Sequence, residues 1–280
     1  MRLLLTILSF LFLQACFSQQ IITSWNFNTP LPPDNNLTTG TQIPFMGSGV
    51  CYLVGGASPS ATNPYNSGSD NDYFSVSRDN TGWNIRNFPA QGTASKTAGI
   101  FFSCNTTGYQ NIKLKFDEKH SNSSPNTTVV QYNPDTTNAA GWVDVQVNKL
   151  ADTTYSETYL THIVDLSSIT TVNNKPRVGI RIVAAFDPDS SLRYIATYYK
   201  TAAAYSPGGG TIRFDLATFT GLPLGGCTVP ATQAGGVELI SAGTNSISFS
   251  YRRGTGDSVD RKSTRLNSSH SSVSRMPSSA

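Results

Sequence analysis

The stretch Thr97–Tyr132, TAGIFFSCNTTGYQNIKLKFDEKHSNSSPNTTVVQY, decides the fold class. It contains three β-forming runs separated by two polar turns: Gly99–Ser103, Asn111–Asp117 and Thr128–Tyr132. The middle run places apolar residues at every second position, at Ile112, Leu114 and Phe116, which is the period of a half-buried strand. We therefore predict that the three runs form an antiparallel sheet with one solvated face.

Similar short β-forming segments recur roughly every ten residues through the rest of the chain up to residue 220. They are Ile21–Phe27, Gly49–Val54, Tyr73–Val76, Trp83–Phe88, Trp142–Val147, Tyr159–Leu166, Val178–Phe186 and Thr211–Thr220. Only Ser167–Asn173 is typical of a helical turn, and no segment has a sustained helical period with caps. The pattern predicts an all-β, antiparallel β-sandwich in which the first and last strands pair.

Composition and charge argue against a nucleic-acid-binding protein. Of the 280 residues, 13% are charged, about half of the usual share, and Ser, Thr, Asn and Gly supply the polarity instead. The net charge of +3 arises entirely in the tail Asp260–Ala280, which has four basic residues and one acidic residue. The body of the chain therefore has no basic surface of the kind that captures nucleic acid, and no segment is long and apolar enough for a transmembrane helix.

The N-terminus predicts export from the cell. Arg2 is followed by the apolar run Leu3–Leu13, which is too short to span a bilayer and suits a signal peptide ending at Ser18. A lipid anchor through Cys16 is the alternative, because Leu13–Cys16 is similar to a bacterial lipobox. We expect a secreted or cell-surface protein that is monomeric.

The sequence leaves two possible states open for the cysteines. If Cys16 is removed with the signal peptide, Cys51, Cys104 and Cys227 remain in an oxidising compartment. Cys51 and Cys104 could form a disulfide, or both could be buried as small hydrophobic side chains, which we favour.

The body, Gln19–Leu224, resembles a jelly-roll-like domain of large secreted surface proteins of Bacteroidetes-type bacteria, of the type IX sorting kind. Four segments carry the resemblance: WNFN (Trp25–Asn28), TTGYQNIKLKFD (Thr106–Asp117), VVQYNPD (Val129–Asp135) and TIRFD (Thr211–Asp215). These motifs are structural, so the resemblance implies a jelly-roll-like sandwich and no particular reaction.

Residues 225–259 begin a second module. Two alternating segments, Gly236–Ile240 and Ser246–Tyr251, follow a linker with Pro and Gly, and GTNSISFSYRRGTGD (Gly243–Asp257) resembles the start of a fibronectin type III repeat. The repeat is truncated, because Asp260–Ala280 resembles translated sequencing-adapter read-through. A natural Ser-rich, disordered tail is the alternative for this segment.

Titratable residues offer no catalytic constellation. We interpret His120 as a solvated loop residue, and Asp117 with Glu118 as solvated charges at the end of a strand. His162 is followed by Asp165, but no GxSxG segment supplies a nucleophile. The sequence therefore predicts a non-catalytic module.

Ligand binding remains the alternative to catalysis. In jelly-roll sugar-binding modules a structural calcium often bridges the first and last strands, which the resemblance would place at Asn26, Asn28 and Asp215. Aromatic side chains could stack on sugar rings, and the candidates are Trp83, Trp142, Tyr198, Tyr199 and Tyr205. The alternative for both tryptophans is burial in the core, which we favour.

We predict a binding or adhesion module at the cell surface, with polysaccharide or extracellular matrix as partner. The alternative is an accessory domain of a larger secreted hydrolase, a nuclease, phosphatase or glycosidase, whose catalytic domain is missing from this sequence.

Overall fold

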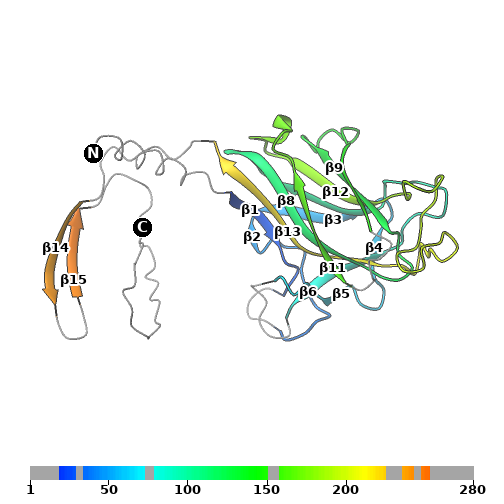
Figure 1. The fold of residues 1–280 in the computed structure, drawn as a ribbon, viewed down its shortest axis with the longest axis horizontal. Helices are drawn as coiled ribbons and strands as arrows, with labels where there is room; N and C mark the ends of the chain where they lie inside the picture. Colours follow the sequence, from blue (N-terminus) through cyan, green and yellow to red (C-terminus); the bar gives the residue numbers. More distant parts are fainter. Residues whose placement is uncertain are drawn as a thin grey trace, which may run out of the picture. The chain divides into compact units, whose positions relative to one another are not determined.

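The computed structural model describes residues 19–29, 34–72, 79–150 and 158–224, together with the backbone of 235–242 and 247–252. The first four ranges form two antiparallel sheets packed face to face, in which β8 and β13 lie side by side as the longest strands (Figure 1). Within the described residues the only helical element is the 3₁₀ turn η1 (Thr170–Val172). The predicted all-β, jelly-roll-like sandwich is confirmed.

One sheet has eight strands and the other has five. The main path of the larger sheet is β11 (Tyr159–Asp165), β8 (Tyr109–His120), β13 (Ile212–Pro223), β1 (Gln20–Trp25) and β2 (Met46–Gly47). Its remaining strands are β6 (Thr81–Arg86), which also pairs with β13, and β4 (Ser58–Pro59) and β5 (Tyr65–Ser67), which pair with β6. The smaller sheet runs β10 (Val143–Lys149), β9 (Thr127–Asn133), β12 (Val178–Ala184), β7 (Gly99–Cys104) and β3 (Gly49–Val54).

The prediction that residues 97–132 form one continuous sheet is wrong. Strands β7 and β9 belong to the five-stranded sheet, whereas β8 between them belongs to the eight-stranded sheet. Both polar turns therefore cross from one sheet to the other. Alternation of apolar residues shows which face of a strand is buried, but it does not show which strand lies beside it.

The core lies between the two sheets and is built from the alternating positions that the sequence singles out. Ile112, Leu114 and Phe116 of β8 are fully buried there. They meet the inward-facing side chains of the opposite sheet, which include Ile100, Phe102, Val130, Ile180 and Ile182. Trp25 packs against Phe102 across the sandwich, with ring centroids 5.2 Å apart.

Strand β13 occupies the centre of the larger sheet because it has neighbours on both sides. Its N-terminal half pairs with β6 and its C-terminal half with β1, and β8 runs along the other side. The predicted pairing of first and last strands is therefore confirmed. The register shifts after Asp215, where Leu216 has a φ of 50°. Because of this irregularity, β13 can pair with β6 along its N-terminal half and with β1 along its C-terminal half.

The C-terminal unit, which the contacts separate from the first after Gly226, contains the antiparallel pair β14 (Gly235–Ala242) and β15 (Ile247–Arg252). Both strands were expected from the sequence, but the fibronectin type III assignment remains a prediction. The signal peptide, the strand at 73–76 and the tail at 260–280 lie outside the described residues. No helix among the described residues has the length and hydropathy needed to cross a membrane.

Candidate functional site

The outer face of the five-stranded sheet carries one continuous row of functional side chains. The backbone register aligns Tyr52 with Phe101, Phe101 with Arg181, Arg181 with Gln131, and Gln131 with Asp144. Each residue comes from a different strand. The row faces away from the core, because the neighbouring positions on these strands supply the core side chains. We call this row, together with Trp142, the platform.

Aromatic side chains form one half of the platform. Tyr52 is 49% exposed, and its ring centroid lies 4.3 Å from that of Phe101. Trp142 is partly buried and meets Phe101 edge-on at 5.8 Å. Phe101 is only 3% exposed although it lies outside the core cluster, because these two rings cover it. The result is a rigid aromatic surface whose outer rings reach solvent.

Polar side chains form the other half as a connected chain. The Arg181 guanidinium lies over the Trp142 ring, 4.4 Å from its centroid, and its Nε donates to Gln131 Oε1. Gln131 Nε2 in turn donates to Asp144 Oδ1 at 2.6 Å, and Asp144 pairs with Lys96. Burial opposes the Asp144 charge, but Lys96 and Gln131 outweigh it and lower its pKa.

Gly179 makes room for Trp142 to lie against the sheet. A Cβ at this position would be 2.6 Å from Thr136 Cγ2 and 3.1 Å from atoms of both Phe101 and Trp142. A side chain here would therefore clash with Thr136 and press against the rings of Phe101 and Trp142. The glycine is needed for the close approach and not for backbone conformation.

The five aromatic residues predicted to bind ligand do not lie together in the structure. Trp83 is 4% exposed and belongs to the core, and Tyr205 is buried with its hydroxyl donating to Pro89 O at 2.7 Å. The favoured interpretation of Trp83 as a core residue agrees with its burial, whereas Tyr205 was expected to be accessible and is covered by neighbouring segments. Tyr198 and Tyr199 are half exposed and meet edge-on at 5.2 Å in a loop. Only Trp142 belongs to the platform.

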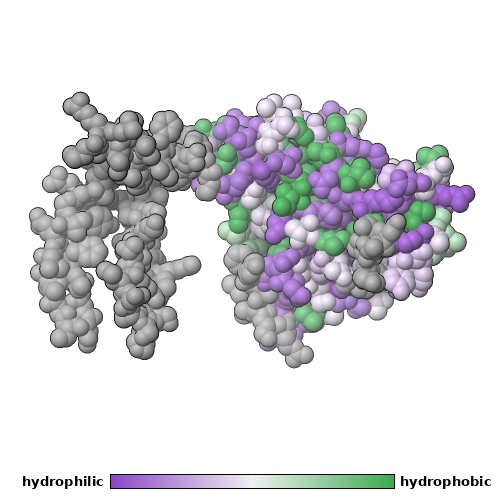
Figure 2. All heavy atoms as spheres, in the orientation of Figure 1, coloured by the Kyte–Doolittle hydropathy of each residue, from purple (hydrophilic) through white to green (hydrophobic). Residues whose placement is uncertain are grey.

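Figure 2 shows hydrophobic residues in small groups separated by hydrophilic ones over the visible face of the sandwich. Such scattered residues are usual on a soluble domain.

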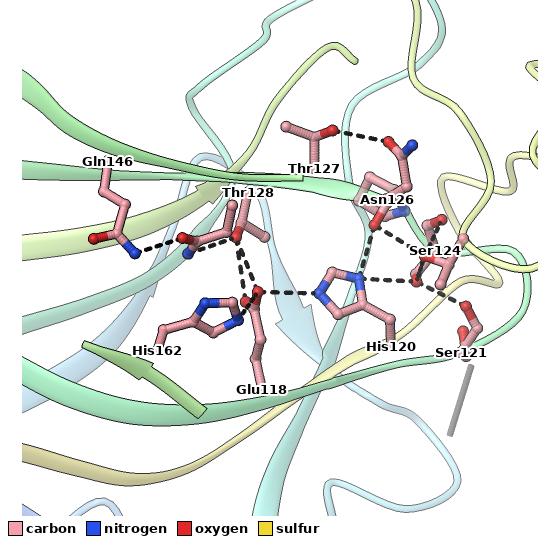
Figure 3. A network of polar contacts seen from close by, with 12 residues as sticks. Glu118, His120, Ser121, Ser124, Asn126, Thr127, Thr128, Gln146 and His162 are labelled. Atoms are coloured by element: carbon pink, nitrogen blue, oxygen red, sulfur yellow. Dashed lines mark hydrogen bonds and ion pairs between the residues drawn. The ribbon is translucent and has the colours of Figure 1, made fainter. Parts of the chain in front are cut away.

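A second cluster of chemically active side chains lies inside the sandwich. Glu118 lies between the rings of His120 and His162, as Figure 3 shows. Its Oε1 is 2.9 Å from His162 Nε2 and 3.4 Å from His120 Nε2. Thr128 reaches it from the opposite sheet, with Oγ1 3.2 Å from both carboxylate oxygens. The cluster therefore links the two sheets.

The prediction that Glu118 and His120 are solvated was wrong, because both are almost completely buried in β8. Burial opposes the charge of Glu118, but the two histidines outweigh it and lower its pKa to about 2. Burial likewise opposes the charge of His162, yet Glu118 raises its pKa. His120 Nδ1 lies 2.8 Å from Pro125 O, which can only accept a hydrogen bond, so this nitrogen carries a proton. The cluster is a buried network of polar contacts that joins the two sheets.

Asp117 was also predicted to be solvated and is fully buried, on the outer side of the larger sheet. Its carboxylate accepts hydrogen bonds from Ser69 Oγ, from Asn71 Nδ2 at 3.0 Å and from Thr161 Oγ1 at 2.6 Å. Asp215 lies directly opposite it on β13. A loop that contains Ser69 and Asn71 therefore covers a pair of facing carboxyl groups.

The residues predicted to bind calcium are buried, and two of them make hydrogen bonds within the protein. Asn28 donates to Asp72 Oδ2 at 2.7 Å and accepts from Thr81 N at 2.8 Å. Asp215 instead accepts backbone hydrogen bonds at both carboxylate oxygens. The third residue, Asn26, is buried nearby in sequence.

The environment of Asp215 favours a proton over a charge. Burial, together with the charges of Asp72 and Asp117, raises its pKa well above the ordinary value. Among the residues that the structure describes, no group of three or more His, Cys, Asp or Glu side chains is placed to hold a metal ion. Calcium binding by Asn26, Asn28 and Asp215 stays a prediction.

Cys51 and Cys104 lie on the paired strands β3 and β7 as free thiols. Cys104 is buried in the core, as the favoured interpretation has it, and Cys51 is partly buried and packs against the core. Burial raises the pKa of the Cys104 thiol to about 12 and that of Cys51 well above its ordinary value.

Sequence reasoning missed most of the platform, although signals were available. Tyr52 and Phe101 occupy outward positions on strands whose other face is already apolar. Arg181 is the one charged residue in the apolar segment Val178–Ala184. What the sequence could not supply was the register that brings these residues into one row.

Comparison with known proteins identifies no family. No family model and no curated protein matches the chain. Among solved structures, the K1 cleaved adhesin domain of Lys-gingipain from Porphyromonas gingivalis W83 has a TM-score of 0.35 at 11% identity, covering 72% of this chain and 97% of that one. A mutant of a family 29 carbohydrate-binding module has a TM-score of 0.31 at 11% identity, covering 73% and 91%. The Stig cyclase Fisc from Fischerella sp. TAU has a TM-score of 0.33 at 10% identity, covering 74% and 89%. With scores and identities this low, these similarities assign the chain neither a family nor a function.

Proposed function

We propose that the sandwich is a glycan-binding module that acts outside the cell and binds sugar through the platform. One observation carries the proposal: solvent-facing rings of Tyr52 and Trp142 lie beside an ordered chain of hydrogen-bonding side chains on a rigid sheet. The apolar faces of sugar rings stack on aromatic side chains, and their hydroxyl groups need fixed polar partners. The platform offers both on one surface.

The preformed geometry supports binding further. Gln131 is held between Arg181 and Asp144, so its side chain loses little freedom when a ligand arrives. The half-exposed Tyr198 and Tyr199 form a second aromatic surface, but their two rings are perpendicular and do not offer one plane. The platform is therefore the better candidate. The apolar run at Leu3–Leu13 supports the extracellular part of the proposal.

A glycan array probed with the full chain tests the proposal. We expect binding that falls at least about tenfold in Tyr52→Ala and in Trp142→Ala, as is usual when a central aromatic contact is removed. Tyr198→Ala is the matched control and should bind as the unmodified chain does. Loss of binding in the control alone would move the site to the loop, and no binding to any glycan would overturn the proposed function.

A further inference from the structure

Arg181 is a cation at the centre of the platform. Of its three guanidinium nitrogens, only Nε donates a hydrogen bond within the described residues. Its Nε donates to Gln131, and Trp142 covers one face of the group. Among the described residues, none accepts a hydrogen bond from Nη1 or Nη2, and neither nitrogen is a buried atom without a partner. The two nitrogens therefore face solvent.

The surrounding charges do not neutralise Arg181. Asp144 is the nearest acidic residue of the row, but it pairs with Lys96 and accepts its other hydrogen bond from Gln131. No ion pair joins Asp144 to Arg181 within the part of the chain that the structure describes. Burial lowers the pKa of Arg181, and the charge of Asp144 offsets only part of this effect, so an anion at Nη1 and Nη2 would stabilise the cation further.

A second cation lies just before the strand that carries Arg181. Arg177 is exposed and directly precedes β12, four residues before Arg181, which is about 13 Å along an extended chain. Asp135 offsets part of this charge, since the charges of Arg177 and Lys175 contribute to the lowering of its pKa. Asp144 is the other charged residue of the platform and pairs with Lys96, so Arg181 is the charged residue of the row whose hydrogen-bond donors are still available.

We infer that the platform selects acidic polysaccharides, with a sugar carboxylate bound by the Nη1 and Nη2 atoms of Arg181 while its ring stacks beside Trp142. The planar guanidinium matches a carboxylate with two parallel hydrogen bonds, which an ammonium group cannot do. Its orientation is already set by Gln131 and the indole ring. This inference rests on the proposed glycan-binding function and specifies the class of glycan.

Titration calorimetry with the full chain tests the inference on a matched pair of ligands, polygalacturonate and its fully methyl-esterified form. Alginate and hyaluronan complete the acidic set, and xyloglucan serves as a neutral comparison. We expect at least one acidic polymer to bind at least about tenfold more tightly than the neutral ones, with affinity falling as salt rises. Esterification should remove the preference where the bound polymer is polygalacturonate.

Two substitutions separate charge from geometry. Arg181→Gln should weaken acidic-glycan binding at least about tenfold, and Arg181→Lys should recover only part of it because the bidentate contact is lost. Unchanged far-ultraviolet circular dichroism and melting temperature show that each variant is folded.

The possible outcomes test the glycan-binding function and the preference for acidic glycans separately. Binding of neutral and acidic polymers with equal affinity, still dependent on Trp142, would overturn the acidic preference and leave the glycan-binding function standing. Binding of acidic polymers that Arg181→Gln does not weaken would also overturn the inference. Binding to none of the polymers would overturn the acidic preference, and binding to no glycan on the array would overturn both.

Discussion

Replacing Glu118 with glutamine should destabilise the sandwich through the loss of one buried charge. The substitution keeps the shape of the side chain and its contact with Thr128, but it leaves His120 and His162 without an anion. Removing one partner of a buried ion pair typically costs about 3–5 kcal/mol. The structure allows a narrower expectation.

The magnitude follows from the pKa of Glu118. Its pKa falls from 4.5 to about 2, although burial opposes the charge, so the two histidines favour the ionised form strongly. At about 1.4 kcal/mol for each pKa unit, the shift corresponds to about 3 kcal/mol. Because Glu118 is completely buried, solvent does not screen this contribution. We expect Glu118→Gln to lower the free energy of unfolding by about 3 kcal/mol.

The pH dependence has a definite sign. The folded-state pKa of His162 is raised above 6.5, so its contribution is fully present below pH 6.5 and is lost as pH rises through the raised value. The contribution of Glu118 is present above pH 4.5 and is lost as pH falls towards about 2. The unmodified protein should therefore lose stability as pH rises above 6.5, and Glu118→Gln should lose less over the same range.

Urea unfolding followed by tryptophan fluorescence measures both effects. All three tryptophans, Trp25, Trp83 and Trp142, lie in the sandwich, so the signal reports on this unit of the full chain. Asp165→Asn is the matched control. Lys113 lowers the pKa of Asp165 to about 2 as well, but the carboxyl is 50% exposed, and solvent screening limits its contribution to at most about 1 kcal/mol. A cost below about 1 kcal/mol for Glu118→Gln, with an unchanged pH profile, would refute the ionised network.

Three further predictions follow from the structure. Gly179→Ala should displace the indole of Trp142, abolish glycan binding and change the near-ultraviolet circular dichroism, whereas Gly208→Ala should do neither because its Cβ meets nothing closer than 3.8 Å. Cys51 and Cys104 should resist thiol-reactive dyes in the native state and react in denaturant, since burial raises the pKa of both thiols; rapid native labelling of either would contradict their placement. A chelator should leave the melting temperature unchanged, and a fall that calcium reverses would show that the buried carboxyl groups near β13 bind the ion.

The sequence by itself determined the local structure. The alternation from Ile112 to Phe116 marks the buried face of β8, and Gly49–Val54 forms a strand with the predicted bounds. Pairing of β1 with β13 was also predictable, because the termini of a sandwich often meet. These features depend on side-chain period and turn residues within a few positions of each other, which a single sequence displays directly.

Only the tertiary structure decided the functional surface and the buried ion network. Tyr52, Phe101, Arg181, Gln131 and Asp144 are distant in sequence and become one row only through strand register. In the sequence, Glu118, His120 and His162 have the polar character of surface residues. In the folded protein the opposite sheet covers them. Register and burial depend on which strands pair across the whole chain, and the free energy that selects these pairings comes from packing the complete core. For this reason the residues of each segment predicted that it forms a strand. They did not predict which strands lie beside it or which ligand the resulting surface binds.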